Sequence, residues 1–174
     1  KTGIDLPGEG SGVLWPVEKW TGYSVTRIPF GQEVSVTALQ MIRAFCMLAN
    51  GGRPVTPYVV QGWVEKDADG NPQVTKVRTP DSPTGYVVKP EVARWVVHEA
   101  LVAVVNEGTG KRAALKKWQV FGKTGTANIA DTQTRGYTET YVASFIGGAP
   151  VEDPKVVVMV SVRKPNRRLG KGYT

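Results

Sequence analysis

The chain has 174 residues, of which 41% are apolar, and its formal net charge is +7. This size fits one globular domain or part of one, and no apolar run approaches the roughly 18 residues of a membrane-spanning helix. The single cysteine excludes an internal disulfide, and one cysteine with one histidine cannot supply a zinc site built from those ligands.

Nucleotide-binding glycine motifs are absent from the sequence. There is no G-x-x-x-x-G-K-[ST] motif, and Gly108-Thr109-Gly110 follows a helical pattern instead of opening one. We therefore expect no metal and no cofactor.

The positive charge favours acidic partners, but the basic residues form no stripe with interleaved aromatic residues, so we expect no nucleic acid. The densest basic cluster, between residues 163 and 171, is predicted to be a solvated loop.

The first half of the chain predicts loops, one helix and a hairpin. Residues 1–31 are rich in glycine and proline and are predicted to be mostly loop. Thr37 and Gln40 have the spacing of a capping box, which predicts a helix that ends at Asn50-Gly51-Gly52. Cys46 falls on the apolar side of this helix, so we expect a packed thiol and not a nucleophile. Residues 58–65 and 73–78 read as a hairpin, followed by a linker at 79–85.

A second helix is predicted from Pro90 to about Asn106, because proline suits the first helical position and Asn106-Glu107-Gly108 provides a stop. His98 lies on this helix and is interpreted as a surface or core-edge residue. A role as general base is the alternative, although the sequence pairs it with no serine or carboxylate. Residues 111–117 are predicted to form a short helical turn.

Three strands are predicted in the last third of the chain: Gln119–Thr126, Tyr141–Ala149 and Val156–Arg163. Residues 127–138 are predicted to form the loop between the first two, and Val151–Pro154 the turn between the last two. Consecutive strands with such connections form an antiparallel meander. The predicted fold class is therefore α+β, an antiparallel sheet packed with helices on one face.

The first of these strands carries the candidate site, Lys123-Thr124-Gly125-Thr126. A lysine ammonium supplies charge and several donors for a carboxylate, and the two threonine hydroxyls add directional hydrogen bonds. Gly125 removes a Cβ where a ligand or another backbone must come close. Lys1-Thr2-Gly3 has the same three letters, but it lies in a turn-rich run with no strand before it, so we interpret it as an irregular surface segment.

Several segments, taken in order, resemble class B penicillin-binding proteins. They are the opening TGIDLPGEGSG, the stretch from Gly31 to Gly52 that contains VSVTALQMIRAFCMLANGG, VVNEGTGKRAA at 104–114, FGKTGTA at 121–127, and YVASFIGGAPVEDPKVVVMVSV at 141–162. The likeness covers nearly the whole chain and is weakest at residues 61–86. It implies that residues 1–174 are the C-terminal portion of one transpeptidase domain, of the penicillin-binding and serine β-lactamase-like kind, with no second domain.

In that family the domain is a peptidoglycan DD-transpeptidase and the target of β-lactams, with the motifs S-x-x-K, S-x-N and K-T-G. The resemblance places Lys123, Thr124, Gly125 and Thr126 on the third motif, as substrate-binding residues. It also implies that the backbone N–H of Thr126 supplies half of an oxyanion hole. The implied partners are the stem peptide, β-lactams, the N-terminal part of the same protein and other cell-wall synthesis proteins. The implied location is the periplasmic side of the bacterial inner membrane, with an anchor outside this chain.

Strand geometry adds one inference that does not depend on the family. Alternation sends Lys123 and Gly125 to one face and Thr124 and Thr126 to the other. All four can serve a single ligand only if it lies along an open edge of the strand, paired with its backbone. A stem peptide that ends in D-Ala-D-Ala fits this arrangement.

The chain departs from the family pattern because no S-x-N triplet occurs and the one S-x-x-K match, Ser161 to Lys164, falls on a predicted strand. The family needs that pair on a helical turn, where residues three apart are neighbours. We therefore place the serine nucleophile outside this chain and expect the chain to be inactive alone. Two alternatives remain: a non-catalytic homologue that senses wall peptide or β-lactam, and a basic module that binds nucleic acid or another anionic polymer.

Overall fold

A computed structural model describes residues 1–78, 84–130 and 137–166. They fall into two compact units, one of Lys1–Arg43 with Val55–Thr84 and the other of Ala44–Pro54 with Gly85–Thr174. Most of the predicted linker at 79–85 and part of the predicted basic loop lie outside the described residues.

In the first unit, the segment rich in glycine and proline forms only short elements, as predicted. Lys1-Thr2-Gly3 belongs to no strand or helix, and the side chain of Lys1 is exposed. The elements that follow are β1 (Val13–Leu14), which pairs antiparallel with β2 (Val34–Ser35), and between them η1 (Val17–Lys19), α1 (Ser24–Arg27) and η2 (Ile28–Phe30).

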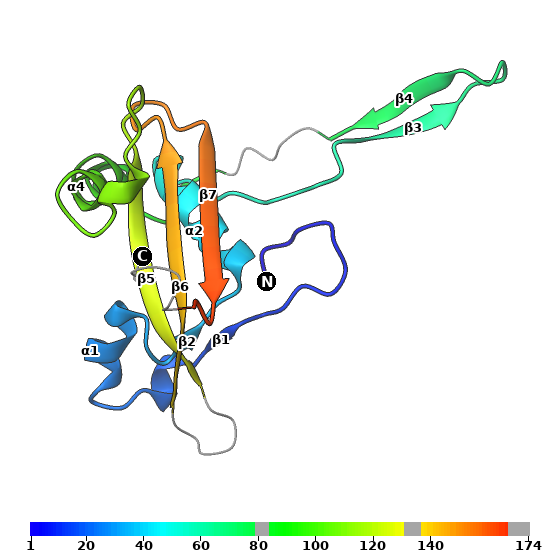
Figure 1. Ribbon diagram of the computed structural model, residues 1–174. Helices are drawn as coiled ribbons and strands as arrows, with labels where there is room; N and C mark the ends of the chain where they lie inside the picture. The colour runs from blue at the N-terminus through cyan, green and yellow to red at the C-terminus, as the bar shows by residue number, and fades with distance from the viewer. Residues whose placement is uncertain (79–83, 131–136, 167–174) are drawn as a thin grey trace. The chain divides into compact units, whose positions relative to one another are not determined.

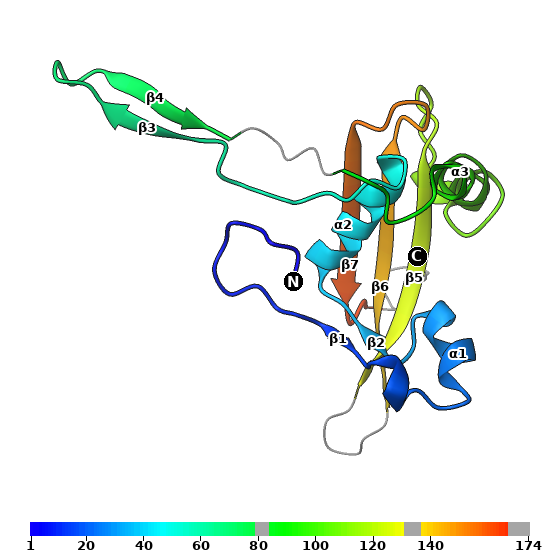
Figure 2. The ribbon, with the colours of Figure 1, turned by 180° about the vertical axis from the view of Figure 1, so that it is seen from behind.

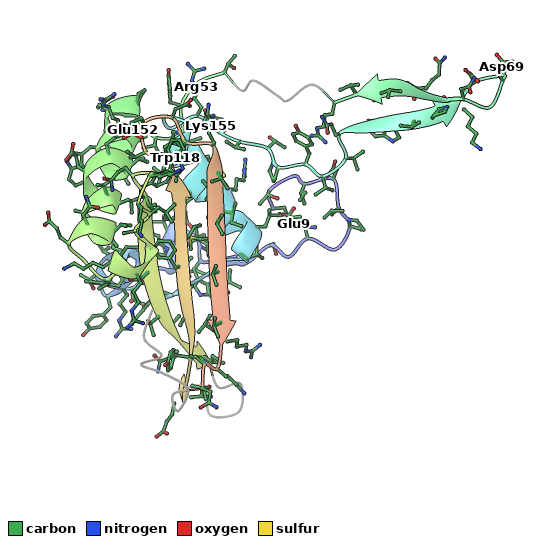
Figure 3. All side chains as sticks on the ribbon, turned by 45° about the horizontal axis from the view of Figure 1, so that its top comes forward. Glu9, Arg53, Asp69, Trp118, Glu152 and Lys155 are labelled. Carbon is green, nitrogen blue, oxygen red and sulfur yellow. The ribbon has the colours of Figure 1, made fainter. Side chains whose placement is uncertain are left out.

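The predicted hairpin is present in the first unit, but its first strand begins at Gly62 and not at residue 58 as predicted. It consists of β3 (Gly62–Lys66) and β4 (Pro72–Val77), which pair antiparallel. The Asp67 carboxylate stabilises the turn by accepting hydrogen bonds from the amides of Asp69 (3.0 Å) and Asn71 (2.8 Å). Figure 3 shows Asp69 at the tip of this hairpin.

The capping box predicted for the first long helix, α2 (Ala38–Ala49), is confirmed. The Gln40 amide donates to Thr37 Oγ1 (3.1 Å), and the Thr37 amide donates to Gln40 Oε1 (2.9 Å). At the other end, the Gly52 amide donates to the carbonyl of Met47 (2.8 Å), and Gly51 and Gly52 both have positive φ. Left-handed glycines end the helix here without the steric strain of a Cβ.

The second predicted helix begins at Pro90 and ends at Asn106, but it is not a uniform α-helix. It consists of α3 (Pro90–Trp95), a π-helical turn η3 (Val96–Ala100) and α4 (Leu101–Asn106). Its buried residues recur every four positions: Ala93, Val97, Leu101 and Val105. Such a stripe drifts by about 40° per step around an α-helix, and a wider π turn counteracts that drift. This run lies beside β5 in Figures 1 and 2.

The second unit contains the predicted three-stranded meander. Strands β5 (Phe121–Ala130), β6 (Tyr137–Ala149) and β7 (Val156–Arg163) pair antiparallel in the order β5-β6-β7. Within the described residues, β5 is therefore an edge strand, as Figure 1 shows. Phe121 and Ile146 are buried and share one face of the sheet.

The prediction of a loop over residues 127–138 is wrong at both of its ends. β5 continues to Ala130 and β6 begins at Tyr137, with a register shift between Asn128 and Ala130. Most of the residues concerned are small or polar, with Ile129 and Tyr137 as exceptions, so side-chain periodicity gave no strand signal. Backbone pairing between β5 and β6 extends the ladder there instead. The central residues of this predicted loop, 131–136, lie outside the described residues.

Three glycines make room for the ring of Phe145 on β6. A Cβ added at Gly122 would overlap Phe145 Cζ, and one added at Gly147 would lie 2.9 Å from Phe145 Cε1. A Cβ at Gly110, in the turn after α4, would lie 3.4 Å from Phe145 Cε2. The ring therefore lies against Gly122 and Gly147 of the sheet and against the turn that contains Gly110.

We expect Gly122→Ala to destabilise the full-length protein by about 1–3 kcal/mol, because the added methyl group overpacks a site with no free space. For a domain of this size that corresponds to a fall in Tm of roughly 2–12 °C. Gly22→Ala is the matched control, since a Cβ there meets nothing within 4 Å. Thermal unfolding followed by circular dichroism gives both values. Equal Tm for Gly122→Ala and the unchanged protein would mean that Phe145 does not pack as described.

Candidate functional site

The predicted site residues Lys123–Thr126 lie in the first half of β5. In the β5–β6 ladder, Lys123 lies opposite Ile146, Thr124 opposite Phe145 and Gly125 opposite Ser144. Opposed residues of an antiparallel pair share a face, so Lys123 and Gly125 lie on one face and Thr124 on the other. The alternation that the sequence argument used is therefore present in the structure.

The backbone around Gly125 indicates which groups face the open edge of β5. Ser144 Oγ, on β6, lies 3.4 Å from the carbonyl oxygen of Gly125. The carbonyl of Gly125 therefore points toward β6. Neighbouring strand residues direct their backbone groups to opposite sides. The N–H and C=O groups of Thr124 and Thr126 then lie on the open edge.

The side chains at this edge are accessible. Lys123 and Thr126 are exposed, and Thr124 and Gly125 are half-buried. Lys123 Nζ donates a hydrogen bond to the carbonyl oxygen of Thr124 (2.9 Å), which brings the ammonium group to the open edge. None of the ion pairs found among the described residues includes Lys123. An ammonium group has three donors, so it retains capacity for an anionic ligand.

A residue that sequence reasoning did not assign to the site also contacts it. Thr109, in the turn after α4, has its Oγ1 atom 2.6 Å from Thr124 Oγ1, within hydrogen-bond distance. The sequence pattern of Gly108-Thr109-Gly110 suggested only a possible nucleotide-binding motif, which was excluded. The sequence places Thr109 15 positions before Thr124. Nothing in its local pattern signals that the turn folds back onto the strand.

The other reactive residues considered from sequence lie outside β5. Cys46 is half-buried on α2, and burial raises the pKa of its thiol, as expected for a packed cysteine. His98 is half-buried in the π turn. Ser161 is in β7, and Lys164 follows the end of that strand, so these two residues do not have the helical geometry that an S-x-x-K pair needs.

No group of three or more histidine, cysteine, aspartate or glutamate side chains that could hold a metal ion occurs in the described part of the chain. The β5 edge itself presents an ammonium group, hydroxyls and backbone amides. Within residues 1–78, 84–130 and 137–166, no helix has the length and apolar character needed to cross a bilayer.

Comparison with known proteins identifies the family. The whole chain, residues 1–174, matches the penicillin binding protein transpeptidase domain. The chain belongs to this transpeptidase family. Stage V sporulation protein D of Bacillus subtilis is 39% identical over an alignment covering 100% of this chain and 26% of that protein. Penicillin-binding protein PbpB of Mycolicibacterium smegmatis is 34% identical, over 96% of this chain and 26% of its own length.

Solved structures of penicillin-binding proteins share the fold. Penicillin-binding protein 3 of Mycobacterium tuberculosis, in complex with aztreonam, matches with a TM-score of 0.81 and 31% identity. That match covers 95% of this chain and 37% of the other. The predicted α+β fold class and the resemblance to penicillin-binding transpeptidases are confirmed. The chain spans about a quarter of the length of the curated relatives it matches.

We expect the 174-residue chain alone to form no covalent adduct with a fluorescent penicillin, because its one S-x-x-K sequence ends a strand. Intact-mass spectrometry after incubation measures this directly, and the full-length protein under the same conditions is the control. A stoichiometric adduct on the isolated chain would show that one of its own serines is a nucleophile.

Proposed function

We propose that this chain is the C-terminal portion of one transpeptidase domain, in a protein that cross-links peptidoglycan stem peptides by acyl transfer through a serine ester. Both compact units belong to that domain in this proposal. The nucleophilic serine and its lysine lie outside these 174 residues. The observation that carries the proposal is the edge strand β5, whose Lys-Thr-Gly-Thr segment has accessible side chains, in a chain of the transpeptidase family.

The first role of the segment is to hold a carboxylate. The C-terminal carboxylate of a stem peptide, or the carboxylate of a β-lactam, lies along the open edge of β5. Lys123 supplies the opposite charge, and the hydroxyls of Thr124 and Thr126 donate directional hydrogen bonds. The peptide backbone pairs with the strand in the manner of an added strand, while Gly125 leaves space for that approach.

The second role belongs to the backbone N–H of Thr126. When the serine attacks the substrate carbonyl, negative charge develops on the carbonyl oxygen of the tetrahedral intermediate. A backbone N–H on the open edge can donate to that oxygen, and such donors stabilise the transition state by roughly 2.7–4 kcal/mol each. Collapse of the intermediate expels the terminal amine and leaves the acyl group on the serine. The amine of a second stem peptide then attacks this ester, which forms the cross-linking amide and releases the serine hydroxyl.

Binding of β-lactams follows from the same geometry, because these inhibitors present an anionic group, a carboxylate in the penicillins, beside a reactive carbonyl. The related structures of Mycobacterium tuberculosis penicillin-binding protein 3 in complex with aztreonam and with ampicillin support this part of the proposal. We place the protein outside the cytoplasm, where peptidoglycan is cross-linked, with a membrane anchor outside this chain. Its partners in this proposal are the rest of its own polypeptide and other proteins of cell-wall synthesis.

We expect Lys123→Ala to slow acylation of the full-length protein by a carboxylate-bearing β-lactam about tenfold or more. Loss of a charge-assisted contact to a bound carboxylate is worth roughly 1.5–3 kcal/mol, and about 1.36 kcal/mol corresponds to a factor of ten in rate. The second-order rate constant for labelling by a fluorescent penicillin is the measurement.

Lys1→Ala is the matched control, because Lys1 begins the same three-letter sequence outside any strand and should leave the rate unchanged. Equal effects of the two substitutions would refute the assignment of the site to β5. Reversible binding of β-lactam by the full-length protein without a covalent adduct would favour the non-catalytic sensor instead.

A further inference from the structure

We propose that Thr109 is a positioning residue for this site: its hydroxyl orients the hydroxyl of Thr124 toward the carboxylate of the ligand. The proposal rests on the proposed function of the β5 edge and extends it to a residue outside the Lys-Thr-Gly-Thr segment. The observation that carries it is the distance of 2.6 Å between the two Oγ1 atoms.

Hydrogen bonds to α4 fix the turn that carries Thr109. The Gly108 amide donates to the carbonyl of Ala103 (3.0 Å), and the Gly110 amide donates to the carbonyl of Val104 (2.9 Å). Thr109 therefore lies between two residues whose backbones are bonded to the last turn of the helix. These short-range hydrogen bonds therefore restrict the position of Thr109 relative to α4.

Packing fixes the same turn to the sheet. Gly110 lies against the ring of Phe145, and that ring also lies over Gly122 of β5. Phe145 is opposite Thr124 in the β5–β6 ladder, so the ring and the Thr124 side chain share a face. The Phe145 ring thus connects the turn to β5 beside the residue that Thr109 contacts.

The number of hydroxyl protons determines which threonine donates in the Thr109–Thr124 hydrogen bond when a ligand is bound. Each threonine hydroxyl has one proton to donate and can accept from other donors. A Thr124 hydroxyl that donates to a ligand carboxylate has no second proton for Thr109. When ligand is bound, Thr109 therefore donates to Thr124, and Thr124 donates to the carboxylate. This chain of two hydrogen bonds aligns the Thr124 proton and polarises it toward the ligand.

The exposure of the Thr109 and Thr124 side chains indicates that their hydrogen bond is stronger in the ligand-bound protein than in the free protein. Thr109 is exposed and Thr124 is half-buried, so water competes with their hydrogen bond in the free protein. A bound ligand excludes that water, and the bond then becomes stronger. We therefore expect loss of the Thr109 hydroxyl to affect acylation and to leave thermal stability nearly unchanged.

The test compares the full-length protein with its Thr109→Val, Thr109→Ser, Thr124→Val and Thr109→Val/Thr124→Val variants, by the second-order rate constant for acylation with a fluorescent penicillin. Thr109→Val should lower this constant about three- to tenfold, the range for loss of one hydrogen bond between neutral groups. Thr109→Ser, which keeps the hydroxyl, should stay within about twofold of the unchanged protein. In the Thr124→Val background, Thr109→Val should have almost no further effect, because the two hydroxyls act as a unit.

Thr75→Val is the matched control, since Thr75 is also exposed and its hydroxyl donates to one carbonyl on the neighbouring strand. Its acylation rate and Tm should equal those of the unchanged protein. Three results would each overturn the proposal: an unchanged rate in Thr109→Val, a loss in Thr109→Ser as large as in Thr109→Val, or full additivity of the Thr109 and Thr124 effects. If the unchanged protein is not acylated at all, the proposed function itself fails and this inference fails with it.

Discussion

The open edge of β5 is the structural feature on which the proposed function depends. A strand within a sheet uses its backbone groups on both sides, whereas an edge strand leaves one row for a partner. Here β6 occupies one side of β5, and the groups of Thr124 and Thr126 lie on the other. A ligand along that edge is reached by side chains from both faces of the strand. Lys123 and Thr124 can then contact the same carboxylate although they alternate.

In the proposed mechanism, two kinds of interaction at this edge differ in what they do for the reaction. The proposed contacts of Lys123 and Thr124 with a carboxylate are made both in the bound substrate and in the transition state, so their role is to bind and orient. The proposed role of the Thr126 N–H is to stabilise charge that develops only during attack, and therefore to lower the barrier itself. Among side-chain substitutions, only proline removes this backbone N–H. Its position depends on the strand, and therefore on the packing of Gly122 and Phe145.

The sequence predicted the elements whose signals are local. The capping box at Thr37, the proline start of the second helix and the β-branched run of β7 were all sufficient to place their elements. The π turn was not predictable, because it responds to how a four-residue stripe meets the sheet. The ends of β5 and β6 were missed because backbone pairing, and not side-chain burial, extends them. The contact of Thr109 with Thr124 was missed because it depends on the tertiary position of a glycine-rich turn.

The most direct test of the central claim is a crystal structure of the full-length protein acylated by a carboxylate-bearing β-lactam. We expect the ligand to lie along the open edge of β5, with its carboxylate in contact with Lys123 and Thr124. The carbonyl oxygen of the acyl group should accept a hydrogen bond from the N–H of Thr126. A ligand bound with its carboxylate away from this edge, or with its carbonyl oxygen turned away from Thr126, would contradict the account.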